Sequence, residues 1–214
     1  MSWRRRKHHH RRASLGLLAA ALVALGLALA TVGALAHLGS HSSSPERFAG
    51  PLMPPGLHAT AFRLRDQNGQ TATLDQYRGR VLILSFMYAA CRETCPLMAQ
   101  QIKGALDNVG TPIPALAISV SPKTDTPLSA RRFMRRQGLD GRLRFLLGSQ
   151  RHLAPIWQRY GIAPQATRSG HSSFVLLIDR RGVLRVGFPA TQLTPEDLTH
   201  DLRILLAETP PRRS

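Results

Sequence analysis

Apolar residues follow two alternating patterns along this chain. The runs 81–88 and 113–120 are almost continuously apolar, which is typical of strands buried on both faces of a sheet. The segments that follow them, 96–109 and 129–137, are predicted to be helices, the second of them capped by Ser129. Strands therefore alternate with helices, which favours an α/β domain.

The other expected elements are shorter and fit the same fold class. They are a hairpin of strands 62–66 and 71–74, a strand at 143–147, a helix from Ser149 to about Tyr160, a hairpin of strands 174–178 and 183–188, and a helix from a cap at Thr194 to Ala207. This order, with helices on both faces of a central sheet, resembles the thioredoxin-like fold. The chain is therefore predicted to contain one α/β domain of that kind.

A long uncharged segment near the N-terminus indicates a membrane anchor. Residues 15–36 carry no charge, and at about 1.5 Å per residue such a helix spans a hydrocarbon core of roughly 30 Å. The arginines before it predict a single-pass protein of the inner membrane whose C-terminal domain lies in the periplasm. A cleaved signal peptide ending at 34–36 is the alternative. The predicted parts are a basic cytoplasmic tail (1–14), the anchor (15–38), a linker (39–59), the folded domain (60–208) and a C-terminal tail (209–214).

The charge of the chain is strongly positive, with 29 Lys and Arg against 12 Asp and Glu. The densest cluster, Arg131, Arg132, Arg135 and Arg136, lies on a predicted helix. Aromatic residues are few and no nucleic-acid motif occurs, so nucleic acid is not an expected partner. We interpret the cluster as a solvated face, with an acidic docking partner or an anionic membrane surface as alternatives.

Candidate chemistry is concentrated in one short segment. Cys91 and Cys95 are the only cysteines, and they lie four residues apart, after the strand 81–88 and around the start of the next helix. A helix N-terminus favours thiolate over thiol, and thiolate is both the nucleophile and the metal ligand. A structural pair or disulfide is the alternative, because an exported domain can oxidise its thiols.

Three reactive roles are compatible with this pair. Thiol–disulfide exchange usually has two residues between the cysteines, whereas three are present here, and no proline directly precedes the strand at 174. Peroxide reduction needs an activated thiol near an arginine, which Arg92 could supply. A metal site could combine Cys91 and Cys95 with His171, and two sulfurs with one imidazole suit three-coordinate Cu(I). Structural zinc prefers four protein ligands, and no fourth soft ligand is evident.

Three motifs in this order resemble the Sco (SenC) family of membrane-anchored copper proteins that serve cytochrome c oxidase. They are the segment from Cys91 to Pro96, with its C-x-x-x-C-P pattern, the segment 125–127, which reads Asp-Thr-Pro, and the segment 170–174 around His171. The similarity covers about residues 60–207 and the N-terminal anchor. Ser121 stands where the family commonly has an acid, and Ala89-Ala90 where many members have an aromatic or polar pair.

The resemblance implies a function for these residues. Cys91, Cys95 and His171 are expected to bind copper, as Cu(I), Cu(II) or both. The expected function is delivery of copper to an extracytoplasmic acceptor, namely the binuclear copper centre of cytochrome c oxidase subunit II. The alternative is a thiol–disulfide oxidoreductase, in which Cys91 and Cys95 are a redox pair that keeps the acceptor's cysteines reduced. A metallochaperone is favoured over an enzyme.

Overall fold

A computed structural model describes residues 47–163 and 173–209 of the chain. Its strands are β1 (Arg63–Asp66), β2 (Thr71–Thr73), β3 (Leu82–Met87), β4 (Ala115–Ser119), β5 (Leu143–Leu147), β6 (Phe174–Ile178) and β7 (Leu184–Pro189). Its helices are the 3-10 helix η1 (Leu74–Tyr77) and the α-helices α2 (Thr94–Asn108), α3 (Pro127–Arg136), α4 (Gln150–Arg159) and α5 (Pro195–Ala207). The predicted basic tail and anchor lie outside the described residues. Across the two described ranges, no helix has both the length and the apolarity to cross a membrane.

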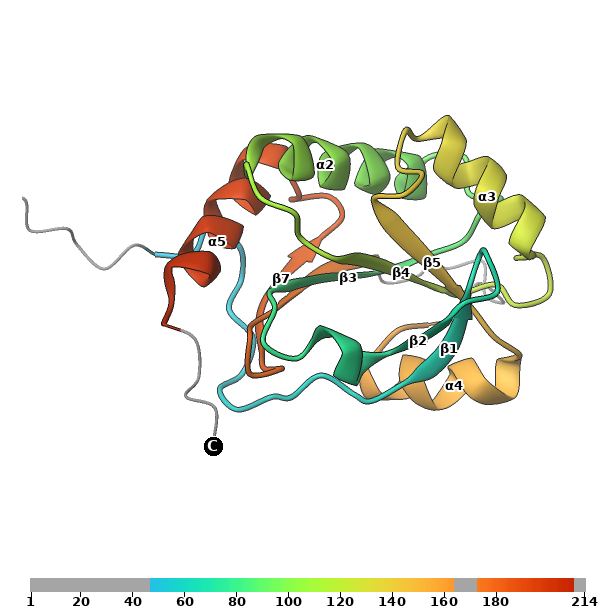
Figure 1. Ribbon diagram of the computed structural model, residues 1–214, viewed down its shortest axis with the longest axis horizontal. Coiled ribbons are helices and arrows are strands. Elements are labelled where there is room, and N and C mark those ends of the chain that lie inside the picture. Colours follow the sequence, from blue (N-terminus) through green and yellow to red (C-terminus); the bar gives the residue numbers. More distant parts are fainter. Residues whose placement is uncertain (1–46, 164–172, 210–214) are drawn as a thin grey trace, which may run out of the picture. The chain divides into compact units, whose positions relative to one another are not determined.

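The strands form one sheet in the order β2-β1-β5-β4-β3-β6-β7 (Figure 1). β3, β4 and β5 run parallel to one another, and β6 pairs antiparallel with β3 on the other side. The predicted hairpins are confirmed as β1–β2 and β6–β7. The α/β prediction is therefore confirmed, with element ends that differ by a few residues from those expected.

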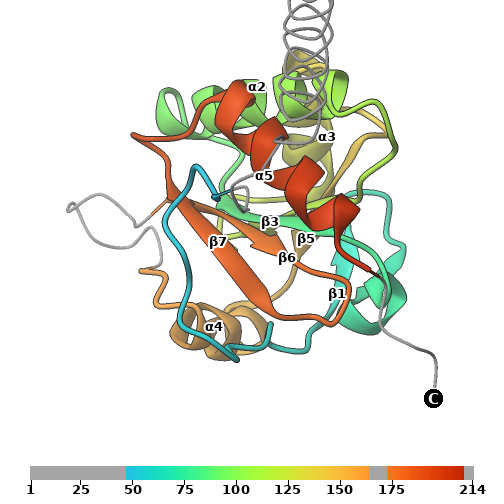
Figure 2. The same cartoon turned by 90° about the vertical axis from the view of Figure 1, so that its left-hand side faces the viewer.

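Helices cover both faces of this sheet. Figures 1 and 2 show α2, α3 and α5 on one face and α4 on the other. Alternate residues of β3 face the two layers: Ile83 and Met87 belong to the core beneath α2, whereas Leu82, Leu84 and Phe86 belong to the core on the α4 side. All five side chains are at most 1% exposed, which explains why this strand is apolar throughout.

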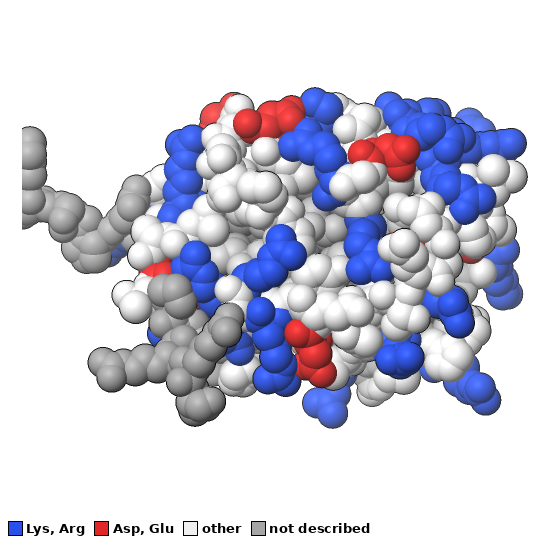
Figure 3. Space-filling view, in the orientation of Figure 1, with Lys and Arg blue, Asp and Glu red and all other residues white. Residues whose placement is uncertain are grey.

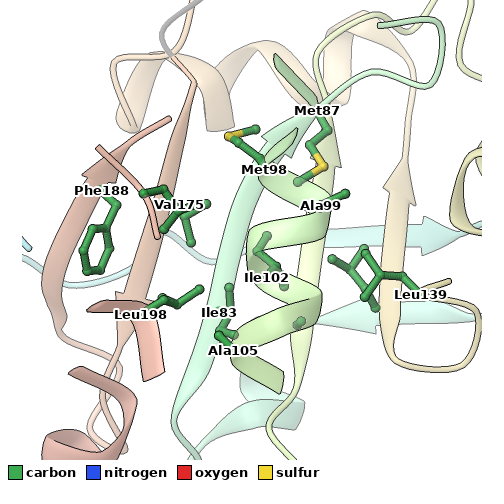
Figure 4. Packing of buried hydrophobic residues seen from close by; sticks show 14 of the residues in the cluster. Ile83, Met87, Met98, Ala99, Ile102, Ala105, Leu139, Val175, Phe188 and Leu198 are labelled. Atoms are coloured by element: carbon green, nitrogen blue, oxygen red, sulfur yellow. The ribbon is translucent and has the colours of Figure 1, made fainter. Parts of the chain in front are cut away.

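The core beneath α2 fixes that helix against the sheet. Met98 and Ile102 of α2 point toward Ile83 and Met87 of β3 (Figure 4). Burial of each such side chain stabilises the fold by about 1.5–3 kcal/mol. The first turn of α2, which contains Cys95, is thereby held in a fixed position at the end of β3.

The predicted cap of α3 was wrong by three residues. Thr126, not Ser129, is the N-cap, and its hydroxyl accepts a hydrogen bond from the Ser129 backbone N–H at 3.1 Å. The Ser129 hydroxyl in turn accepts from the Thr126 N–H at 2.8 Å, so the two residues form a reciprocal capping box. Pro127 then occupies the first helical position, where its missing N–H is not needed.

The chain before β1 packs against the far edge of the sheet. From Arg47 onward, the second part of the predicted linker lies along β7, with backbone bridges from Leu52 to Val186 and from His58 to Val183. The buried carboxylate of Asp201, on α5, accepts hydrogen bonds from the backbone N–H groups of Ala49 and Gly50 at 2.7 and 3.0 Å. This segment is therefore held by a buried acid as well as by the strand edge.

Candidate metal centre

The cysteine segment leaves the sheet at the carboxyl end of β3. Since β3 and β4 are parallel, their carboxyl ends meet at one edge of the sheet, where α/β proteins place their ligands. Cys91 lies in the loop between β3 and α2 and is partly exposed, whereas Cys95 lies in the first turn of α2 and is fully buried. The fold thus places one thiol at the surface and the other behind it.

The two cysteines are free thiols in direct contact. The backbone N–H of Cys95 donates a hydrogen bond to Cys91 Sγ at 3.2 Å, and the backbone N–H of Cys91 donates to the carbonyl of Tyr88 at 3.2 Å. The loop therefore folds into a tight turn in which a helix-terminal N–H points at sulfur. This geometry favours negative charge on Cys91.

The pKa values of the two cysteines are shifted in opposite directions. The hydrogen bond from the Cys95 side chain, aided by backbone N–H groups and opposed by burial, lowers the pKa of Cys91 to about 5. The same side-chain hydrogen bond and burial raise the pKa of Cys95 far above its ordinary value. Burial, and then the hydrogen bond with Cys91, raise the pKa of Tyr88 to about 12. At neutral pH the site is therefore one thiolate supported by a neutral thiol and a neutral phenol.

A buried acid holds this loop from below. Asp125 Oδ1 accepts a hydrogen bond from the backbone N–H of Ala89 at 2.8 Å, and Oδ2 accepts from the Ser119 hydroxyl. Burial raises the pKa of Asp125 above its ordinary value. Asp125 belongs to the Asp-Thr-Pro motif but was not among the expected site residues, although its place just after the second parallel strand puts it at the same edge as the cysteines.

Cys91 opens onto a surface pocket of about 370 Å³. Arg92 and Pro96 line it on the cysteine side, and Phe133 and Arg136 line it from α3. Larger surface hollows of about 520 and 760 Å³ occur elsewhere, but no thiol lines either of them. The pocket beside Cys91 therefore gives a ligand access to its sulfur.

The third expected ligand, His171, lies outside the described residues. Within residues 47–163 and 173–209, no group of three His, Cys, Asp or Glu side chains is placed to hold a metal ion. The sheet register nevertheless bears on the prediction. Ser85 of β3 pairs with Val175 of β6 in antiparallel register, so β6 begins at the edge where β3 ends. The described chain thus resumes, at Ser173, on the cysteine side of the sheet.

Comparison with known proteins identifies relatives of this arrangement. Residues 53–207 match the family model described as SCO1/SenC. An SCO2-like protein of Rickettsia conorii is 23% identical over 133 residues, which is 56% of this chain and 64% of that protein. The chain thus spans less than two thirds of the length of this curated relative.

Two solved structures have the same architecture. ScoI of Bradyrhizobium japonicum, solved with copper bound, is 26% identical with a TM-score of 0.59, covering 70% of this chain and 99% of that one. BsSco, a member of the Sco family of cytochrome c oxidase assembly proteins in which a disulfide switch was identified, is 20% identical with a TM-score of 0.62, covering 73% and 97%. These likenesses confirm the predicted thioredoxin-like α/β fold.

Proposed function

Because this chain belongs to the SCO1/SenC family, we propose that it binds copper and takes part in the assembly of cytochrome c oxidase. The observation that carries the proposal is the pair of cysteines without a disulfide at the carboxyl edge of β3, of which Cys91 is a thiolate at neutral pH. Thiolate sulfur is a soft ligand that selects Cu(I) over hard cations. The copper-bound ScoI relative supports the choice of metal.

The proposed ligands are Cys91, Cys95 and His171. Cys91 needs no deprotonation at neutral pH, whereas Cys95 must lose a proton because burial and its hydrogen bond hold it as a thiol. An imidazole from the chain before β6 would complete a three-coordinate site for Cu(I). The start of β6 beside the end of β3 supports this choice of histidine.

Copper is the cargo of this site in the proposal, and delivery is ligand exchange. An acceptor thiolate entering through the pocket beside Cys91 bonds to copper as the bond to Cys91 breaks, with no change in oxidation state. Cys91 is the natural first sulfur to leave, because it is partly exposed and is stable as a free thiolate. Cys95 then takes a proton from water as copper departs, which restores the starting thiol and makes the return of copper less favourable.

The finer parts of the proposal concern location and acceptor. Residues 15–38 anchor the protein in the inner membrane, and the domain 60–208 lies in the periplasm. The acceptor is the binuclear copper centre of cytochrome c oxidase subunit II. The uncharged run 15–36 and the basic residues before it support the anchor. The assembly role of the Sco family, to which BsSco belongs, supports the acceptor.

A Cu(I) titration tests the metal site. The full chain, reduced and held in neutral detergent, is titrated against a colorimetric Cu(I) chelator, and the bound copper is counted. We expect about one copper per chain, and a loss of affinity of about a hundredfold or more in Cys91→Ser, Cys95→Ser and His171→Ala. His152→Ala, on α4, is the matched control and should bind like the parent. Equal binding by His171→Ala and the parent would refute the ligand set.

A thiol–disulfide reductase is the second candidate. It is favoured by the opposite pKa shifts of the two cysteines, which make Cys91 a thiolate and keep Cys95 protonated. The Cys91 thiolate would attack a substrate disulfide, form a mixed disulfide and release one substrate thiol. Cys95, after losing its proton, would then attack Cys91 Sγ and release the second substrate thiol, which leaves a Cys91–Cys95 disulfide. Rapid reduction of a model disulfide by His171→Ala, which should lack copper, would favour this role over copper delivery.

A further inference from the structure

Two arginines from different elements line the pocket beside Cys91. Arg92 follows Cys91 in the loop after β3, and Arg136 lies in the last turn of α3. Both side chains are exposed. Neither forms an ion pair or a side-chain hydrogen bond within the part of the chain that the structure describes. Within the described ranges, the pocket therefore presents two guanidinium groups that have no carboxylate partner, next to the sulfur of Cys91.

Among the described residues, the lining of the pocket contains no acid to pair with these arginines, and the neighbouring Glu93 does not line it. The residues outside the described ranges contain a single acid, Glu46, so the rest of the sequence has almost no partner to supply. Figure 3 shows Lys and Arg gathering over α3, at the upper right of the view. Arg132 and Arg135, also exposed, extend the same charge along this helix.

The end of α3, which carries Arg136, is fixed relative to α2, the helix that contains Cys95. The side-chain amide of Gln100, on α2, donates hydrogen bonds to the backbone carbonyl and the side-chain oxygen of Gln137 at 3.0 and 2.9 Å. Gln137 directly follows Arg136 and also lines the pocket. The two sides of the pocket are therefore held together before any partner arrives, which reduces the entropy lost on binding.

A purely structural role explains only part of this arrangement. Arg135 and Arg136 lie in the last turn of α3, where cations stabilise the carboxyl end of a helix. Arg92 is not on that helix and has no such role. Its convergence with Arg136 on the pocket that exposes Cys91 requires a separate explanation.

We propose that the pocket beside Cys91 is a docking site for an acidic protein segment, whose carboxylates pair with Arg92 and Arg136. The concave shape, with Phe133 and Pro96 among its lining residues, suits an inserted peptide loop better than a flat lipid surface, which would close off Cys91. Guanidinium groups pair with carboxylates in two-point geometry, so the arginine pair can orient a loop as well as attract it. The proposal names the partner chemistry of the proposed delivery site, and it rests on that function only for what the partner receives.

The test measures docking without metal. The full chain in neutral detergent is mixed with a short synthetic peptide rich in glutamate and free of cysteine, and with a matched peptide in which glutamine replaces glutamate. We expect the glutamate peptide to bind the parent about three- to tenfold more tightly than it binds Arg92→Gln/Arg136→Gln. The difference should shrink at high salt, since the screening length falls from about 10 Å at 0.1 M to about 3 Å at 1 M.

Two further variants keep the test specific. Arg92→Lys/Arg136→Lys retains the charge but loses the two-point geometry, so it should bind the peptide more tightly than the glutamine variant and more weakly than the parent. Arg151→Gln/Arg159→Gln removes two exposed arginines from α4, on the opposite face of the sheet, and should bind the peptide like the parent. The basic N-terminal tail is common to all variants, so its contribution cancels from the comparison. An equal loss in the α4 variant would mean that only net charge matters and would overturn the site.

Other outcomes separate this proposal from its alternatives. If the parent and Arg92→Gln/Arg136→Gln bind the glutamate peptide equally, the docking site is refuted whatever the Cu(I) titration gives. If the same substitutions weaken binding to mixed micelles containing phosphatidylglycerol as much as they weaken peptide binding, the choice of a protein segment is overturned. Failure of the parent to bind copper would refute the proposed function while the peptide result still stands.

Discussion

Two distant regions of this molecule are held by the same device, a buried aspartate that accepts backbone hydrogen bonds. Asp125 holds the cysteine loop through the N–H of Ala89, 36 residues away along the chain. Asp201 holds the segment before β1 through Ala49 and Gly50, more than 150 residues away. Burial raises the pKa of both acids, so both carry the cost of a desolvated carboxylate.

The difference lies in what each acid supports. The loop that Asp125 binds leads to Cys91. The segment that Asp201 binds carries no side chain of comparable reactivity among the described residues. A buried, shifted carboxylate is therefore no sign of chemistry by itself. Asp125 should affect both copper binding and stability, whereas Asp201 should affect stability alone.

The largest effect is expected from removing the acid far from the thiols. Asp201→Ala leaves two backbone N–H groups without acceptors, one of them in buried Gly50, and should lower the free energy of unfolding by about 2–4 kcal/mol. Chemical denaturation of the reduced full chain measures the loss. The Cu(I) affinity of the folded variant should equal that of the parent. A copper affinity that falls with stability would break the distinction between the two regions.

The loss in free energy of unfolding caused by Asp201→Ala should also depend on pH. Burial raises the folded-state pKa of Asp201 above its ordinary value of 3.8, so the acid contributes most when protonated. Its contribution is complete below the ordinary value and is lost as pH rises through the raised, folded-state value. The difference in free energy of unfolding between parent and variant should therefore decrease from acidic to neutral pH. A difference that increases would contradict the raised pKa of Asp201 in the folded state.

The second prediction concerns the acid behind the cysteine loop. Asp125→Ala removes the acceptor for the Ala89 N–H and frees the turn that presents Cys91. We expect Cu(I) affinity to fall by about 10- to 100-fold, the usual cost of losing a group that orients a metal ligand. Ser119→Ala is the control, because it removes the other hydrogen bond to Asp125 but leaves the contact with Ala89. A loss as large in Ser119→Ala would show that the loop contact is not the cause.

Sequence reasoning was strongest where a local pattern determines the structure. The apolar run of β3 and the turn signals of the hairpins predicted their elements, because burial on both faces and tight turns leave direct marks in sequence. The cysteine pair was correctly placed at a strand–helix junction for the same reason. The cap of α3 was misplaced although Pro127 marks the first helical position, since both Thr126 and Ser129 are good caps.

Contacts between distant segments could not be predicted in this way. The hydrogen bond from Ala89 to Asp125 depends on the register of β3 with β4, which no short stretch of sequence specifies. The binding of Gly50 by Asp201 was missed because the segment around it is rich in proline and glycine, which is typical of a linker. His171 as a ligand stays a prediction that rests on the resemblance and on its place before β6.

The third prediction uses the opposite titration of the two thiols. At neutral pH Cys91 is already ionised and Cys95 is not, so each Cu(I) bound should release about one proton, from Cys95. The apparent affinity should then rise about tenfold per pH unit between about pH 7.5 and 8.5, where an ordinary imidazole is already neutral and only the Cys95 thiol still has a proton to lose. Chelator competition at several pH values gives this slope. A slope near two would mean that both thiols are protonated in the free protein.

The smallest expected effect is the absence of a change in the reactivity of Cys91. Its pKa of about 5 means that the thiolate fraction is nearly constant above pH 7. Alkylation by iodoacetamide should therefore have a flat rate between pH 7 and 9, whereas an ordinary thiol would speed up by roughly 25-fold over that range. Mass spectrometry should find the label on Cys91 and not on buried Cys95.

Asp125 and Asp201 provide the contrast for this measurement. The alkylation profile of Asp201→Ala should be as flat as that of the parent, because Asp201 bonds the segment before β1 and not the cysteine loop. In Asp125→Ala the freed loop should weaken the hydrogen bonds from Cys95 that stabilise the Cys91 thiolate, so the rate should rise with pH. If the alkylation rates of both variants are independent of pH, the Cys91 thiolate is stabilised by the first turn of α2 alone. Asp125 would then have no effect on the pKa of Cys91.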